Sequence, residues 1–274
     1  MPGIFLMIVF PNAKINIGLH VVSKRPDGYH NLETVFYPVQ LTDALEMVES
    51  KTADNFTTSG IFVDGSPDNN MVIKALHLLK KDFDLPQVQF HLHKVIPLGA
   101  GLGGGSSDAA FTLKILNDYF LLRLTKQELK SYAAQLGADC SFFIENKPAF
   151  ATAIGDQLRI IHLDLLEYKI VILKPGFSVS TPEAYKNILP KSPDFNLADL
   201  PQIPFEEWKN VVVNDFEKSV FPKYPEIKKL KEKLYELGAV YASMSGSGSA
   251  VFGIFRHLPT DFDNFIPEGV FIYR

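Results

Sequence analysis

The stretch from Pro97 to Ser107 reads PLGAGLGGGSS and has the residue types of a phosphate-binding loop. A strand pattern precedes it and a helix pattern follows it. Glycine turns and a helix N-terminus can hold a phosphate group because they present backbone N–H groups toward it. The residues that we expect to contact a nucleotide are Pro97, Leu98, Gly99, Ala100, Gly101, Leu102, Gly103, Gly104, Gly105, Ser106 and Ser107.

Three common glycine loops do not fit this stretch. Gly99, Gly101 and Gly104 satisfy the dinucleotide pattern G-x-G-x-x-G, but a second strand ending in an acidic residue about 20 positions later is missing. The helix that follows the loop leads into another helix at Thr125 instead. Gly105 is followed by serine, so the Walker Gly-Lys-Ser/Thr ending is absent, and so are the H-R-D and D-F-G motifs of protein kinases. A connecting turn without a ligand is the alternative reading.

The hydrophobic periodicity predicts an α+β protein. Residues 88–92 alternate as in a half-buried strand, and residues 109–120 carry the apolar stripe of a helix. Thr125 and Glu128 are spaced as a capping box, and further helices are expected over about 205–219 and 225–237. Most strands alternate in hydrophobicity, which favours antiparallel or mixed sheets over a fully parallel one.

Composition limits the classes of protein. The chain has 274 residues, a net charge of −4 and one cysteine, Cys140, so an intrachain disulfide is excluded. The charge gives no basic field for nucleic-acid binding, although a local anion site remains compatible with it. No apolar stretch reaches the about 18 residues of a membrane span. The apolar run near the N-terminus lacks the basic region of a signal peptide, so we expect a soluble, cytoplasmic protein without membrane or nucleic-acid partners.

The loop and six other stretches resemble the GHMP kinases, named for galactokinase, homoserine kinase, mevalonate kinase and phosphomevalonate kinase. The loop and the start of its helix, PLGAGLGGGSSDAA, match the phosphate-binding motif of that family. The other matching stretches are Ala13–Asn16, Arg25–His30, Asn69–Val72, Leu136–Phe143, Asn214–Glu217 and Ser245–Ser249. Arg25–His30 is the most specific, because it matches the members that phosphorylate the 2-hydroxyl of a cytidine diphosphate-linked methylerythritol in the non-mevalonate route to isoprenoids.

The resemblance implies a fold, a reaction and two cofactors. The fold is the two-lobed GHMP kinase architecture with the active site in the cleft between the lobes, and we place the N-terminal ATP-binding lobe at 1–158 and the C-terminal lobe at 159–274. The reaction is transfer of the γ-phosphoryl group of ATP, with Mg²⁺ neutralising phosphate charge. The metal ligands are unassigned, although Ser107 is a candidate, and the oligomeric state is left open.

Two residues are candidates for catalysis. The resemblance implies that Asp139 is the base that accepts the proton of the substrate hydroxyl; spacing alone equally fits an aspartate that ends a helix and binds its own backbone. Lys14 is the expected cation near the reacting atoms, acting on either the hydroxyl or the phosphates. Asn16 shares a strand face with Lys14 and is expected to bind the substrate.

The cytidine site is implied by the resemblance. Tyr29 can stack on the cytosine ring, and His30 can bind its polar edge. From the residues alone, a surface turn with an ordinary packed tyrosine is the better interpretation. Tyr185 is a candidate second stacking wall, Thr181 a candidate substrate contact, and the Ser245–Ser249 turn is expected near the substrate or the phosphates.

Overall fold

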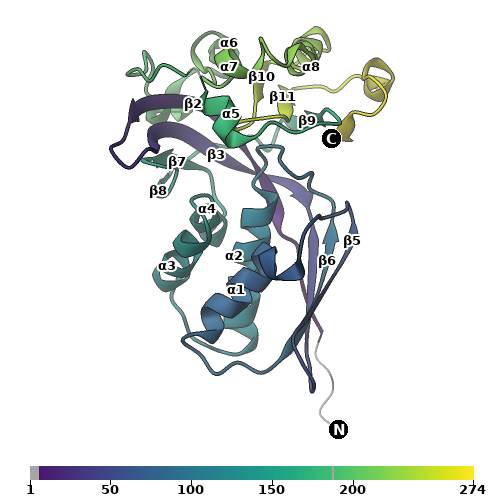
Figure 1. Ribbon diagram of the computed structural model, residues 1–274. Coiled ribbons are helices and arrows are strands. Elements are labelled where there is room, and N and C mark those ends of the chain that lie inside the picture. The colour runs from purple at the N-terminus through teal and green to yellow at the C-terminus, as the bar shows by residue number, and fades with distance from the viewer. Residues whose placement is uncertain (1–5, 187) are drawn as a thin grey trace. The chain divides into compact units, whose positions relative to one another are not determined.

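The computed structural model describes residues 6–186 and 188–274, and the chain divides into two compact units (Figure 1). Unit 1 consists of the residues up to Ala13, Gln40–Leu98 and Gly103–Asn146. Unit 2 consists of Lys14–Val39, Gly99–Leu102 and Lys147–Arg274.

This division differs from a single boundary at 158/159. Residues 14–39 join the later part of the chain because strand β3 (His30–Thr42) pairs with strand β7 (Ala149–Thr152). The first residues of the expected lobe 1–158, residues 1–5, lie outside the described part of the chain.

Unit 1 is built on a four-stranded sheet with helices beside it. The sheet has the order β1-β4-β6-β5, and only the β5/β6 pair is parallel. Its strands are β1 (Met7–Val9), β4 (Ala44–Glu49), β5 (Asn55–Gly60) and β6 (Val88–Lys94). Its helices are η1 (Pro67–Asn69), α1 (Met71–Lys80), α2 (Gly104–Tyr119), α3 (Lys126–Leu136) and α4 (Cys140–Glu145).

The alternating pattern of β6 decides which side chains enter the core of unit 1. Val88, Phe90, Leu92 and Lys94 are buried, and the residues between them are more exposed. The periodic apolar residues of α1 and α2 are also buried, and the two helices pack against each other. Lys94 therefore sits at an inward position of an otherwise apolar face.

Unit 2 contains two four-stranded sheets. The first has the order β2-β3-β7-β8 and the second, fully antiparallel, the order β10-β11-β9-β12. The strands not yet given are β2 (Asn12–Lys24), β8 (Gln157–Ile160), β9 (Lys169–Lys174), β10 (Tyr241–Met244), β11 (Val251–Phe255) and β12 (Phe271–Tyr273). The helices are α5 (Thr181–Tyr185), η2 (Leu197–Gln202), η3 (Phe205–Glu207), α6 (Trp208–Val211), α7 (Glu217–Val220), α8 (Pro225–Glu236) and η4 (Phe262–Phe265).

The core of the second sheet is closed by α8. Ile227, Leu230 and Leu234 lie on one face of this helix and are buried in the same cluster as Val251 and Phe255 of β11. Burial of large aliphatic side chains at this spacing stabilises a helix that is otherwise highly charged.

The expected helix over 205–219 is wrong as a continuous element. It is divided into η3, α6 and α7, with a break between Val211 and Glu217. In the break the chain runs beside β2: the Leu19 amide donates to the Val213 carbonyl, and the Asp215 amide donates to the Leu19 carbonyl. These hydrogen bonds replace helical ones, so the helix is interrupted by pairing with a strand that is distant in the sequence.

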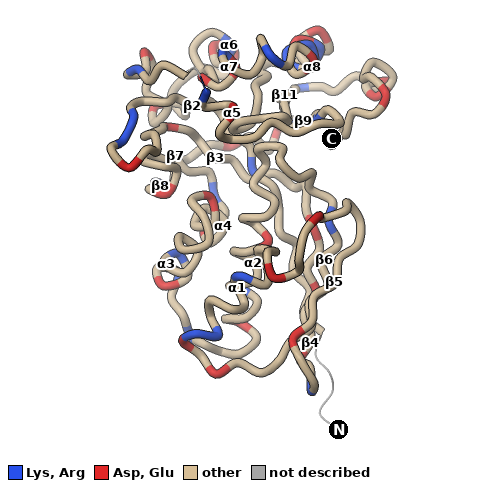
Figure 2. The backbone as a smooth tube through the Cα atoms, viewed as in Figure 1, with Lys and Arg blue, Asp and Glu red and all other residues tan. Residues whose placement is uncertain are grey.

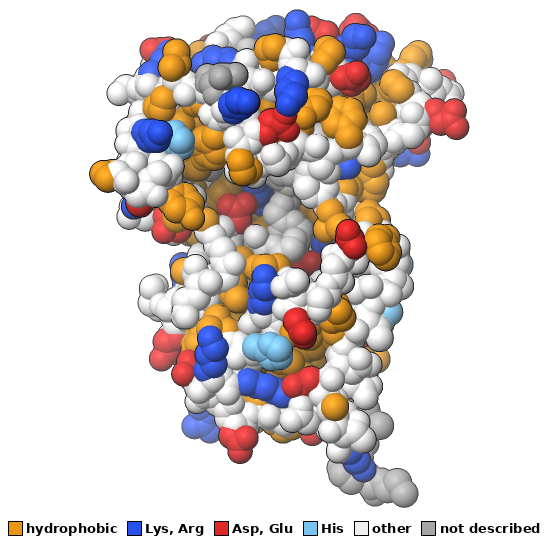
Figure 3. All heavy atoms as spheres, viewed as in Figure 1, with side chains coloured by type: hydrophobic (Ala, Val, Ile, Leu, Met, Phe, Trp, Pro, Cys, Tyr) orange, Lys and Arg blue, Asp and Glu red, His pale blue; other side chains and the backbone are white. Residues whose placement is uncertain are grey.

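The α+β class with antiparallel and mixed sheets is confirmed. Charged side chains of both signs are interspersed along the tube in Figure 2, and Lys and Arg lie among Asp and Glu on the face drawn in Figure 3. None of the helices in the described ranges has the length and apolar character that a membrane span requires.

Candidate active site

The glycine-rich loop leads from β6 into α2, and its backbone needs glycine. Gly99, Gly101 and Gly103 have φ angles of +59°, +74° and +70°, a region that L side chains rarely adopt. At Gly101 the space is closed as well, because a Cβ atom there would lie 2.0 Å from the carbonyl oxygen of Ser245. The positive φ angles, together with the close approach of the Ser245 carbonyl to Gly101, explain why the loop is rich in glycine.

Gly101→Ala is expected to lower both stability and turnover. A left-handed φ costs an L residue about 1–2 kcal/mol, and the added methyl group also collides with a backbone oxygen. Gly269→Ala is the matched control, since Gly269 has a φ of +79° but no atom within 4 Å of its Cβ position. Thermal unfolding and steady-state kinetics of both variants check this. Equal destabilisation by the two variants would show that the contact with Ser245 has no effect.

The N-terminus of α2 is open to an anion. The helix begins at Gly104 after a left-handed Gly103, and no side chain caps it. Ser107 Oγ is fully buried, and within the described residues it has no hydrogen-bond partner. A helix start with positive partial charge and an unsatisfied buried hydroxyl fits a phosphate group with its cation.

Cys140, the single cysteine, lies in the same unit and is buried. Burial raises the pKa of its thiol to about 11. A neutral, buried thiol is a poor nucleophile, so Cys140 is better interpreted as a packing residue.

A buried charge cluster lies beneath the loop. Lys94 Nζ donates to Asp43 Oδ2 and, at 2.8 Å, to Asp108 Oδ2. Asp43 Oδ1 accepts the amides of Val95 and Ile96 at 2.6 and 2.8 Å, which fixes the chain just before the loop. Burial and the charge of Asp43 raise the pKa of Asp108 to about 7, against the opposing effect of Lys94.

The charge cluster was not predicted from the sequence. Asp108 does not cap the helix, because α2 begins four residues earlier and the side chain pairs with Lys94. The alternating pattern of β6 could have indicated it, because Lys94 continues the series of inward residues Val88, Phe90 and Leu92.

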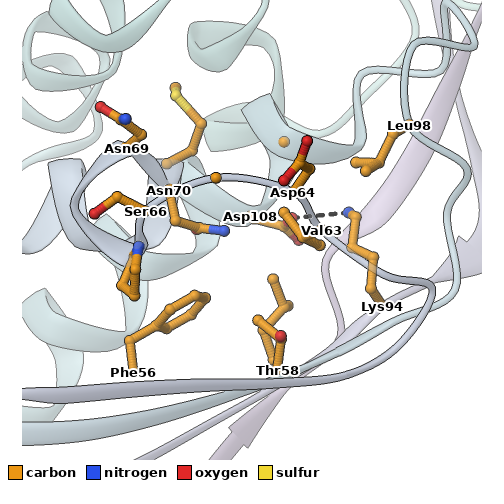
Figure 4. A pocket seen from close by; sticks show the side chains of 15 residues that line it. Phe56, Thr58, Val63, Asp64, Ser66, Asn69, Asn70, Lys94, Leu98 and Asp108 are labelled. Atoms are coloured by element: carbon orange, nitrogen blue, oxygen red, sulfur yellow. Dashed lines mark hydrogen bonds and ion pairs between the residues drawn. The ribbon is translucent and has the colours of Figure 1, made fainter.

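A cavity of about 220 Å³ in unit 1 lies beside the start of α2 (Figure 4). Its lining includes the apolar Phe56, Met71, Leu92 and Leu98 and the polar Asn70, Lys94, Gly105 and Asp108. Asp108 Oδ1 is buried and has no hydrogen-bond partner among the described residues. A largely apolar cavity with a few polar groups next to the glycine loop has the features of a nucleotide-base pocket.

Lys14 and Asn16 form a buried polar network in unit 2. Lys14 Nζ donates to Asn16 Oδ1 at 2.6 Å and to the Gly101 carbonyl at 3.1 Å. Asn16 Nδ2 donates to Thr34 Oγ1 at 3.0 Å. The exposed fractions of Lys14 and Asn16 are 3% and 2%, so the ammonium group is held in a fixed position rather than extended into solvent.

The Ser245–Ser249 turn contacts several other parts of unit 2. Ser245 Oγ donates to the Gly101 carbonyl at 2.8 Å and accepts the Asn16 amide at 3.2 Å. Ser247 Oγ lies 3.2 Å from Thr181 Oγ1. The turn thus joins the glycine loop, β2 and the start of α5.

Asp139 occupies the position just before α4 in unit 1. Its side chain makes no capping hydrogen bond to this helix, and it is half-buried. Lys14 belongs to unit 2 and Asp139 to unit 1.

The three aromatic candidates for the cytidine site, Tyr29, His30 and Tyr185, do not share one set of contacts. His30 stacks on Tyr185 with ring centroids 4.7 Å apart and planes 16° apart, and the edge of Phe216 packs against Tyr185. Tyr29 lies in the turn between β2 and β3, and 64% of it is exposed. The stack in this structure thus joins Tyr185 to His30, while Tyr29 presents its ring to solvent.

Two domain models match the chain. GHMP kinases N terminal domain matches residues 70–147, and GHMP kinases C terminal matches residues 196–261. A 4-diphosphocytidyl-2-C-methyl-D-erythritol kinase of Parabacteroides distasonis is 54% identical over 93% of this chain and 94% of its own length. One of Bacteroides fragilis is 55% identical over 91% and 92%.

The chain belongs to the GHMP kinase family. A crystal structure titled 4-(cytidine 5'-diphospho)-2C-methyl-D-erythritol kinase agrees, with a TM-score of 0.78, 32% identity and 90% of each chain covered. The resemblance inferred from the motifs, including its narrower part, is confirmed by these identities. The GHMP kinase fold expected from it is confirmed as well.

Proposed function

We propose that this GHMP kinase transfers the γ-phosphoryl group of ATP to the 2-hydroxyl of 4-diphosphocytidyl-2-C-methyl-D-erythritol, a step of the non-mevalonate route to isoprenoid precursors. The observation that carries the proposal is the identity of more than half of the residues, over more than nine tenths of the chain, with kinases named for that substrate. The proposed lobes change over near residue 158, between the two matched domain models, and the proposed site of action is the cytoplasm.

ATP binding is assigned to the loop from Pro97 to Ser107 and to the cavity beside it. The loop amides and the N-terminus of α2 bind the phosphates, and the cavity lined by Phe56, Leu92 and Asp108 takes the adenine ring. Mg²⁺ is the proposed counter-ion, and the buried, unsatisfied Ser107 hydroxyl is the proposed contact from this chain. The ion neutralises charge on the phosphate oxygens when bound.

The proposed chemistry uses the side chains of Asp139 and Lys14. Asp139 accepts the proton of the attacking hydroxyl as the new P–O bond forms and the bond between the γ-phosphorus and the bridging oxygen breaks, which releases ADP. Lys14, fixed by Asn16 and the Gly101 carbonyl, stabilises negative charge that develops on the transferred group or the hydroxyl. Phosphoryl transfer has a loose transition state, so fixed positions and charges account for most of its catalysis.

The proposed cytidine contacts are Tyr29, His30 and Tyr185, with Thr181 and Asn16 binding the rest of the substrate. His30 is held against Tyr185, and Tyr29 has an open ring face that a pyrimidine can cover. Burial lowers the pKa of His30, which favours the neutral imidazole that can both donate to and accept from a base edge.

Tyr29→Ala is expected to raise KM for the cytidyl substrate about 5-fold to 100-fold, because base–aromatic stacking contributes about 1–3 kcal/mol. Its kcat and its KM for ATP should change little. Tyr29→Phe keeps the ring and is the matched control, with near-normal KM. An unchanged KM in the alanine variant would remove Tyr29 from the cytidine site.

An acceptor panel tests the proposed function. Purified protein with ATP and Mg²⁺ is offered the cytidyl substrate, mevalonate and homoserine, and ADP and phosphorylated acceptor are measured together. Transfer to the cytidyl compound alone is expected. Transfer to mevalonate or homoserine in its place would assign the chain to another activity of the family.

A further inference from the structure

The motif Asn214–Glu217 matches the family but has no role in the chemistry proposed above. It spans the end of the break between α6 and α7, where the chain runs beside Leu19 of β2. Asn214 is 2% exposed, and its Nδ2 group bonds the last residue of β10 and the turn that follows it. The motif therefore makes tertiary contacts that its position in the sequence does not predict.

Asn214 holds the start of the Ser245–Ser249 turn. Its Nδ2 group donates to the carbonyls of Met244 and Gly246 at 2.8 and 2.9 Å, and its Oδ1 accepts the Phe216 amide at 3.0 Å. Two carbonyls and one N–H require an amide side chain in this orientation. Neither aspartate nor a hydrophobic residue of similar size supplies the same set of bonds.

Glu217 holds the same segment from the strand side. Its Oε1 accepts the Met244 amide at 2.9 Å and the Ser243 hydroxyl at 3.1 Å, and its Oε2 accepts Lys231 Nζ at 2.6 Å. Met244 is thus bound at its N–H by Glu217 and at its carbonyl by Asn214. Hydrogen bonds to a carboxylate are stronger than neutral ones, so the end of β10 is fixed at both backbone groups.

Ser245 connects the end of β10 to the glycine loop and to β2. Internal bonds, such as Gly248 N–H to the Ser245 carbonyl, set the shape of the turn, whereas the Ser245 hydroxyl sets its place against β2 and the glycine loop. That hydroxyl donates to the Gly101 carbonyl and accepts the Asn16 amide. Gly101 and Asn16 also accept from Lys14 Nζ.

We propose that Asn214 and Glu217 are positioning residues for phosphoryl transfer. They fix Met244 and Gly246, so that Ser245 between them holds Gly101 and Asn16 in the places where these orient the Lys14 ammonium. All of these groups lie in unit 2. The inference rests on the proposed function, in which Lys14 acts on the reacting atoms.

The test compares Asn214→Ala and Asn214→Asp with Tyr235→Phe. Both Asn214 variants remove the Nδ2 donor, and the aspartate variant keeps the Oδ1 acceptor and the side-chain volume. Tyr235 is the matched control, because its hydroxyl donates at 3.1 Å to the carbonyl of Ala242 in the same strand but makes no bond to the turn. Steady-state kinetics with ATP and the cytidyl substrate are measured below the melting temperature of each variant.

The Asn214 variants are expected to lower kcat about 10-fold to 100-fold, because small displacements of a charged group are costly in phosphoryl transfer, with a smaller effect on KM for ATP. Tyr235→Phe should keep kcat within about twofold of wild type, because loss of a bond made equally in ground and transition states does not change turnover. Ser245→Ala should lower kcat as well, and the Asn214→Ala/Ser245→Ala double variant should lose less than the product of the single losses, because both act through one contact.

Two results would overturn the inference. One is a normal kcat in both Asn214 variants with melting temperatures lowered as in Tyr235→Phe, which would make the motif purely structural. The other is a double variant whose loss equals the product of the single losses. Absence of turnover by the wild-type protein contradicts the proposed function, and this inference with it. Turnover by the wild type with unchanged Asn214 variants contradicts the inference alone.

Discussion

Asp139→Asn is expected to lower kcat about 100-fold to 10,000-fold, the range that a positioned general base contributes. The amide keeps the size of the side chain but cannot accept the proton of the substrate hydroxyl. Because the carboxylate does not cap α4, the substitution removes no helix cap, and the fold is expected to persist. ATP affinity should stay near the wild-type value, since the loop and the cavity are unchanged.

Rapid-quench measurement of the transfer step, together with ATP binding by calorimetry, checks this result. Asp118→Asn is a suitable control, because Asp118 lies at the far end of α2 from the loop. A variant at Asp139 that turns over at the wild-type rate would remove this residue from the mechanism. Loss of ATP binding along with turnover would instead assign it to the nucleotide site.

Lys14→Met is expected to give a folded protein with kcat lowered about 100-fold to 1000-fold, the loss typical for a group that stabilises transition-state charge. Lys14 is buried, with its ammonium 4.9 Å from the ring centroid of Phe36, and methionine fills the same apolar path. Replacing a buried charge by a hydrophobic residue of similar size is often neutral or stabilising. The Gly101 carbonyl also keeps the Ser245 hydroxyl as a donor.

The diagnostic signature is therefore a melting temperature near or above that of the wild type together with a large loss of turnover. Lys80→Met is the comparison, since Lys80 pairs with Asp54 in unit 1, away from the proposed chemistry. Retention of most of the activity by Lys14→Met would contradict a role of the ammonium in the reaction. Unfolding of the variant would show that Lys14 is needed mainly for stability.

Local signals predicted the elements around the loop, and long-range contacts account for what was missed. The capping box of Thr125 and Glu128 is present as expected, because it involves residues three positions apart. The helix expected over 205–219 is interrupted, because Leu19, near the other end of the chain, pairs with residues in its middle. Hydrophobic periodicity within 205–219 cannot predict a contact with a residue so distant in the sequence.

In the candidate site, too, features set by local sequence were predicted and features set by long-range contacts were not. The glycine loop could be predicted from composition, since the positive φ angles at Gly99, Gly101 and Gly103 require that residue. The role of Lys14 depended on the family resemblance, because a lysine in a strand usually lies at an edge facing solvent. Neither approach predicted the Lys94 charge cluster, which is formed by tertiary contacts between segments distant in sequence.

The most direct test of the central claim is the product itself. Wild-type protein, ATP and Mg²⁺ are incubated with the cytidyl substrate, and the mixture is followed by ³¹P NMR alongside enzymatic measurement of ADP. The proposed function predicts a new phosphate monoester on the 2-position of the methylerythritol, formed in step with ADP. ADP formed without that monoester, or a monoester formed only when mevalonate or homoserine replaces the cytidyl compound, would contradict it.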